Sequence, residues 1–219
     1  MTKIAHVALI LMVLSGCDDT SSREGPIPAD VTYTIINQSS MLNIKKSLDI
    51  RLNKKVSEGA LKTIALALRE SDLKSYERTF IVYYLADMEV GAVGWATSHF
   101  NPDLKIRILG LTVEQEQALK QEPEDMSRNV VGRWLDESPF VGNRTTIFQK
   151  NGKLYMENVY KDGSRGETEL IDKKSSFGRR FDKADGSGSD SGAHWILDSN
   201  GDLQLRDSMG WISTAKKLD

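Results

Sequence analysis

Cysteine and histidine are scarce in this sequence, and their scarcity limits the chemistry that the chain can perform. Among 219 residues there are three histidines and a single cysteine, Cys17. One thiol cannot close a disulfide within the chain, so the folded part must be stabilised by packing. The histidines are far apart, and none has the HExxH or His-x-His spacing of a zinc site. We therefore expect no metal and no cofactor.

An excess of charge of one sign is also missing. The chain has 29 lysines and arginines against 31 aspartates and glutamates, a formal net charge of -2, without a dense stripe of basic residues. Proteins that bind phosphate backbones usually show such a stripe, so nucleic acid is not an expected partner. The Gly-x-Ser-x-Gly turn, the phosphate-binding loop and the dinucleotide fingerprint are absent too, which argues against the common hydrolases and nucleotide-binding enzymes.

The longest hydrophobic run is short. Residues 4–14 are mostly apolar and follow Lys3, whereas a membrane-spanning helix needs about 20 such residues. The run has the length and the basic flank of a signal peptide. It ends in Leu14-Ser15-Gly16-Cys17, which resembles the lipobox of bacterial lipoproteins. The resemblance implies cleavage before Cys17, a diacylglycerol on its thiol and an acyl chain such as palmitate on the new amino group.

We accordingly predict a signal peptide over residues 1–16 and a lipidated tether over residues 17–30. The alternatives are an ordinary secretory signal with a chance cysteine, or an uncleaved anchor. The tether is rich in Ser, Asp, Thr, Gly and Pro and has little to bury. Lipid contributes about 0.8 kcal/mol per buried CH₂, so the acyl chains would hold the protein on a membrane, facing the periplasm or the exterior. Asp18 resembles the inner-membrane retention signal of enterobacterial lipoproteins, which indicates the inner membrane if the host is Gram-negative.

Residues 31–111 alternate between the two periodicities of an α+β domain. Apolar and polar residues alternate over two early segments, which predicts strands, and a run at helical spacing over residues 57–70 follows, with Ser57 as its N-cap. Three more strands are expected at residues 78–85, 92–100 and 104–108, the first of them central because it is apolar on both faces. This order predicts one helix packed on a mostly antiparallel sheet.

The remaining sequence divides into a connector and an all-β domain. Residues 112–129 are polar, begin with a capping box at Thr112, and predict a helical connector. Residues 130–219 contain eight short strand-like runs separated by turn dipeptides such as Asn151-Gly152 and Asp162-Gly163. They predict a β-meander, either a small up-and-down barrel or a curved sheet.

Two short motifs in the β-meander resemble parts of known families. Gly132-Arg133-Trp134 resembles the Gly-x-Trp opening of lipocalins, which implies a tryptophan across the barrel floor and a ligand at the mouth. The plainer interpretation is a core tryptophan. The Gly/Ser-rich segment at residues 186–192 resembles the loop by which small barrel lysozyme inhibitors enter an enzyme cleft, although such a segment also serves as a flexible connection.

One polar cluster suggests a ligand site. Period-two alternation puts Trp95, Thr97 and His99 on one strand face, which runs into a turn with Asn101 and Asp103. An aromatic ring beside an imidazole and a carboxylate is a common arrangement in sites for polar small molecules. The alternative is a core tryptophan followed by an ordinary Asn-Pro-Asp turn.

Two function classes remain open. The first is a membrane-anchored lipoprotein that acts as a binding or interaction module in the cell envelope, with the membrane and an envelope protein as partners. A lysozyme-inhibitor-like barrel is one version of it. The second is an envelope enzyme that uses His99 or His194 with a carboxylate as acid and base. A strongly perturbed carboxylate close to either histidine would favour the enzyme.

Overall fold

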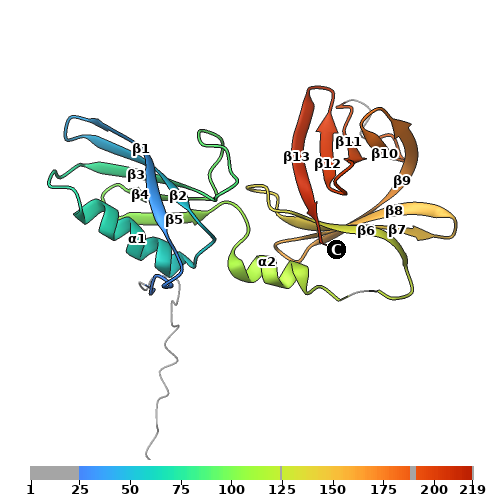
Figure 1. Cartoon of the computed structure of the whole chain (residues 1–219), viewed down its shortest axis with the longest axis horizontal. Coiled ribbons are helices and arrows are strands. Elements are labelled where there is room, and N and C mark those ends of the chain that lie inside the picture. Colours follow the sequence, from blue (N-terminus) through green and yellow to red (C-terminus); the bar gives the residue numbers. More distant parts are fainter. Residues whose placement is uncertain (1–24, 124, 188–190, 219) are drawn as a thin grey trace, which may run out of the picture.

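The protein folds into two domains joined by a short helix (Figure 1). The structure, a computed structural model, describes residues 25–123, 125–187 and 191–218. The predicted signal peptide, the lipobox and Cys17 lie outside the described residues. The first domain is a five-stranded sheet with one helix, and the second is a closed barrel of eight antiparallel strands.

The first domain is α+β, as the sequence predicts. Its strands lie in the order β1-β2-β3-β4-β5, and β3 is the middle strand, as expected for residues 78–85. β2 and β3 are parallel because α1 carries the chain back along the sheet, and all other neighbours are antiparallel. The elements are β1 Tyr33–Met41, β2 Lys45–Leu52, α1 Glu58–Glu70, β3 Arg78–Tyr84, β4 Ala96–Phe100 and β5 Leu104–Ile108.

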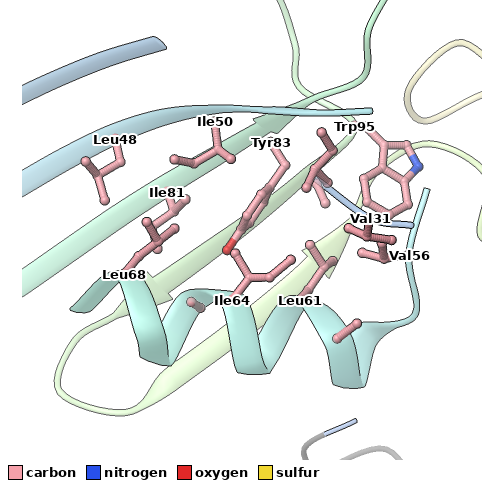
Figure 2. Close-up of a cluster of buried hydrophobic side chains, with 14 of the residues drawn as sticks. Val31, Leu48, Ile50, Val56, Leu61, Ile64, Leu68, Ile81, Tyr83 and Trp95 are labelled. Carbon is pink, nitrogen blue, oxygen red and sulfur yellow. The ribbon is translucent and has the colours of Figure 1, made fainter. Parts of the chain in front are cut away.

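Helix α1 covers one face of this sheet. The Ser57 hydroxyl accepts a hydrogen bond from the Ala60 N–H at 3.2 Å, which confirms the predicted N-cap. Figure 2 shows the apolar side of the helix facing Ile50, Ile81 and Tyr83 of the sheet. The buried helix residues are Ala60, Leu61, Ile64, Ala65 and Leu68. Burial of this stripe between helix and sheet provides the core of the domain.

The segment before β1 is packed onto the first domain. The Gly25 carbonyl accepts a hydrogen bond from the Thr63 hydroxyl at 2.8 Å, and Ile27 packs against the core. The Asp30 carbonyl accepts a hydrogen bond from the Asn53 amide at 2.8 Å. Part of the predicted tether is therefore fastened beside α1, which leaves residues 17–24 between Cys17 and this fastening.

The connector has the capping box that the sequence predicts. Helix α2 spans Val113–Lys120, and the side chains and backbones of Thr112 and Gln115 exchange hydrogen bonds of 3.0 and 3.1 Å. The chain beyond the helix is bound to the barrel, because Arg144 donates to the Glu122 carbonyl at 2.7 Å and Arg128 pairs with Glu157 at 3.1 Å. The connector is thus tied to the second domain.

All eight strands expected in the second domain are present, and the meander closes into a barrel. Closure depends on β13 pairing with β6 through two residue pairs, Lys216 with Leu135 and Lys217 with Trp134. Asn151 and Gly152 have positive φ angles of 51° and 76°, as a tight Asn-Gly hairpin requires. The strands are β6 Asn129–Asp136, β7 Asn143–Lys150, β8 Lys153–Tyr160, β9 Arg165–Ser175, β10 Gly178–Lys183, β11 His194–Leu197, β12 Leu203–Asp207 and β13 Gly210–Lys217.

Lys55 joins the two domains and the connector. It is 9% exposed, lies 2.8 Å from the carboxylate of Glu116 in α2, and also pairs with Glu137 in the loop after β6. Lys120 holds the other oxygen of Glu116. Burial raises the pKa of Glu116, but the hydrogen bonds from Lys120 and Lys55 outweigh it and hold that pKa below its usual value of 4.5.

This pKa shift predicts acid sensitivity at the junction. A carboxyl whose pKa is lowered by folding stabilises the fold above its unfolded pKa, and the contribution is lost as the pH falls through the folded pKa. We expect Glu116→Gln to cost about 1 kcal/mol or less at pH 7. The gap in unfolding free energy between the wild type and this variant should close as the pH falls below about 4.5. Urea titrations at several pH values measure the gap, with Glu114→Gln on the same helix as the control. A gap that stays constant would contradict the prediction.

Candidate functional site

The best candidate for a functional surface is the face of the five-stranded sheet opposite α1, which we call the open face. Alternate residues of β2, β4 and β5 point away from the helix and are exposed or half-buried. Strand pairing places Lys45 beside Arg78, Phe80 beside His99, and His99 beside Lys105. The residues used below are Lys45, Asp49, Arg78, Phe80, His99, Lys105 and Arg107.

An aromatic pair lies on β3 and β4 of the open face, toward the end that begins with Lys45 and Arg78. The rings of Phe80 and His99 meet edge to face, with their centroids 4.8 Å apart. The Lys45 ammonium lies 5.0 Å from the centroid of the Phe80 ring, within the range of a cation–π contact. Partial burial, and then the charge of Arg107, lower the pKa of His99. This shift favours the neutral imidazole, and the positive charge of the face comes chiefly from lysine and arginine.

Four cations surround this aromatic pair without acidic partners. Many basic side chains in residues 25–123, 125–187 and 191–218 form ion pairs with carboxylates. Within these ranges, no ion pair includes Lys45, Arg78, Lys105 or Arg107. Asp49 is the carboxylate on this face, and the Asn37 amide donates to it at 3.1 Å, near the β1 edge. The open face is therefore strongly positive although the chain as a whole is slightly negative.

Arg51 keeps the long β3–β4 loop in place at one end of the open face. Its Nη1 donates to three carbonyls of that loop, those of Leu85 at 2.5 Å, Ala86 at 3.2 Å and Met88 at 2.6 Å. Arg51 therefore has a structural role, because its guanidinium group holds the loop. The aromatic pair of Phe80 and His99 lies toward the other end of these strands, away from Arg51.

The structure separates Trp95 from the other residues of the predicted ligand site. Strand β4 begins at Ala96, and the Trp95 side chain is 1% exposed within the core of the domain (Figure 2). Its indole N–H donates to the Leu111 carbonyl at 2.9 Å. The aromatic ring beside His99 is therefore that of Phe80.

The other predicted site residues remain near one another at one end of β4. His99 is on the open face, and Asn101 and Asp103 form the exposed turn that follows, closed by a hydrogen bond of 3.2 Å from the Asn101 N–H to the Asp103 carbonyl. Ligand binding by Trp95, His99, Asn101 and Asp103 stays a prediction. The geometry favours a broader surface centred on Phe80 and His99.

The histidines have surroundings that do not resemble an acid–base pair. His194 lies 2.6 Å from the Gly192 carbonyl through Nδ1, and His99 contacts Phe80. In the described ranges, neither imidazole forms an ion pair with a carboxylate, and no three His, Cys, Asp or Glu residues are grouped as a metal site. No observation here favours the enzyme alternative.

The two motifs of the β-meander have different outcomes. Trp134 is 1% exposed in the barrel core, its ring lies over Gly132, and its indole donates to the Gly201 carbonyl at 2.7 Å. This agrees with a core tryptophan. In the Gly/Ser-rich segment, residues 188–190 lie outside the described residues, so the resemblance to a lysozyme-inhibitor loop stays a prediction.

Sequence reasoning missed most of the open face. The sequence did contain one signal for this face. Lys105 and Arg107 alternate with apolar residues in β5, which indicates that both side chains are on the polar side of that strand. Phe80 could not be recognised, because it lies in a strand that is apolar on both faces.

Comparison with family models, curated proteins and solved structures finds no match to this sequence or fold. Within the part of the chain that the structure describes, no helix has the length and apolarity needed to span a membrane.

Proposed function

We propose that the protein is a bacterial lipoprotein, held on a membrane by lipid on Cys17, and that its folded part is a binding module of the cell envelope. The observation that supports this proposal is the open face, where four cations without an ion pair among the described residues surround the half-buried rings of Phe80 and His99. The edge-to-face pair of Phe80 and His99 among these cations supports contact with a partner.

Sequence and structure support the anchor and the module separately. The signal-like run and Leu14-Ser15-Gly16-Cys17 support lipidation and a place in the envelope, facing the periplasm or the exterior. Asp18 supports the inner membrane of a Gram-negative host. The packed segment that begins at Gly25 supports a short link between anchor and domain.

The anchor is tested by moving the only cysteine. Cys17→Ser is expected to give an uncleaved and unlipidated precursor, because the lipid bond and the cleavage site both depend on this thiol. Intact-mass analysis of the membrane fraction measures cleavage and lipidation together. The wild type should have the mass of residues 17–219 plus lipid. The double variant Cys17→Ser/Ser21→Cys restores a thiol outside the motif and should remain unprocessed. Normal processing of Cys17→Ser would refute the anchor.

A further inference from the structure

The cations of the open face, which form no ion pair within the described part of the chain, give this face the charge to attract an anionic partner. Lys45 and Arg78 lie side by side on β2 and β3, while Lys105 and Arg107 lie on β5. The distance from β2 to β5 is three strand spacings, about 14 Å. A small anion would reach only one side of this patch. An extended anionic surface would contact all four cations together.

We infer that the open face lies on the anionic lipid surface of the membrane to which the chain is anchored. This inference rests on the proposed lipid anchor at Cys17. A sheet face is a broad surface, as a bilayer is, and this one presents its cations on both sides of the half-buried Phe80 and His99 rings. The positive charge of Lys45, Arg78, Lys105 and Arg107 complements acidic headgroups and outweighs the one carboxylate of this face, Asp49 near the β1 edge.

The length of the link to the anchor permits this orientation. The chain is fastened at Gly25 on the helix side of the sheet, beside Gly59 of α1. Helix and sheet layers are separated by about 10 Å. Residues 17–24 reach at most about 26 Å when extended, at 3.3 Å per residue. The anchor can therefore enter the same bilayer that the open face contacts.

The anchor and the open face would then act as two linked binding events. A basic side chain close to an anionic bilayer contributes about 1 kcal/mol, or roughly fivefold in affinity. Four such side chains give an affinity gain on the order of several hundredfold, before the effect of tethering. The contribution should fall as salt is raised, because the Debye length shortens to about 8 Å at physiological ionic strength.

Vesicle binding by lipid-free protein tests the open face without the anchor. Residues 18–219 retain every described element. We expect this protein to co-sediment with vesicles of equal parts phosphatidylglycerol and phosphatidylcholine, but not with pure phosphatidylcholine. Lys105→Glu/Arg107→Glu should weaken binding at least about 25-fold. Lys150→Glu/Lys174→Glu, with the same change in net charge on exposed barrel residues, is the matched control and should bind nearly as the wild type does.

Three outcomes would overturn the inference. The first is equal binding of the protein to neutral and anionic vesicles. The second is an equal loss of vesicle affinity in the two double variants. The third is binding to inorganic polyphosphate without binding to anionic vesicles. Circular dichroism of each variant checks that it is folded. Because this protein lacks Cys17, the result does not depend on lipidation, and failure of the anchor would be seen separately in the Cys17→Ser experiment.

Discussion

Trp134→Ala is expected to lower the unfolding free energy of the barrel by about 3–5 kcal/mol, the usual cost of truncating a buried tryptophan. The indole is 1% exposed, lies over Gly132 and donates to the Gly201 carbonyl. Its removal leaves a cavity in a core that otherwise consists of Phe181 and aliphatic side chains, with Trp195 partly buried against them. It also leaves the Gly201 carbonyl without this donor, which adds a cost for an unpaired polar group.

Hydrogen exchange followed by mass spectrometry measures this loss within the barrel, because peptides from β7 and β8 report on the barrel alone. Trp211→Ala is the control, since Trp211 is on β13 of the same barrel but is 61% exposed. Its truncation should change stability by about 0.5 kcal/mol or less. Similar losses in the two variants would show that Trp134 does not have the packing role assigned to it.

Trp95→Ala is expected to cost the first domain about 3–5 kcal/mol. Trp95 closes one end of the core, near Val31 and Val56 (Figure 2), and its indole donates to the Leu111 carbonyl just before α2. A Cβ on Gly110 would lie 2.6 Å from the indole ring, so the packing here is tight. The loss should therefore affect both the core and the start of the connector.

The same exchange measurement separates the two domains. After Trp95→Ala, peptides from β2, β3 and α1 should exchange much faster, while those from β7 and β8 should change less, because the two domains have separate cores. Val93→Ala is the control, at a position two residues earlier that is 49% exposed. Equal acceleration in both domains would mean that they unfold as one unit.

Local signals in the sequence predicted most of the fold. Ser57 and Thr112 marked the helix starts because capping hydroxyls and their partners are only three residues apart. Hairpins such as Asn151-Gly152 were visible for the same reason. Closure of the barrel was left open between two alternatives, because it depends on Lys216 and Lys217 pairing with residues about eighty positions earlier. No local pattern carries that pairing.

The open face was harder to predict, because its charges come from separate parts of the chain. Lys45, Arg78 and Lys105 are far apart in the sequence, and the strand order brings them together. The formal net charge of -2 for the whole chain gave no indication of a positively charged surface. Trp95 was assigned to the same face as His99 because strand alternation was extended one residue beyond the start of β4.

The closed order of the barrel has a consequence for how the protein is assembled from parts. Since β6 and β13 are neighbours, the chain enters and leaves the ring of strands at the same place. Among the described residues, no strand of the barrel pairs with the five-stranded sheet, so each domain forms its strand pairings within itself. Gene fusion at residue 112 would transfer α2 and the barrel together, and the sheet with its helix would keep every strand pairing that it has now.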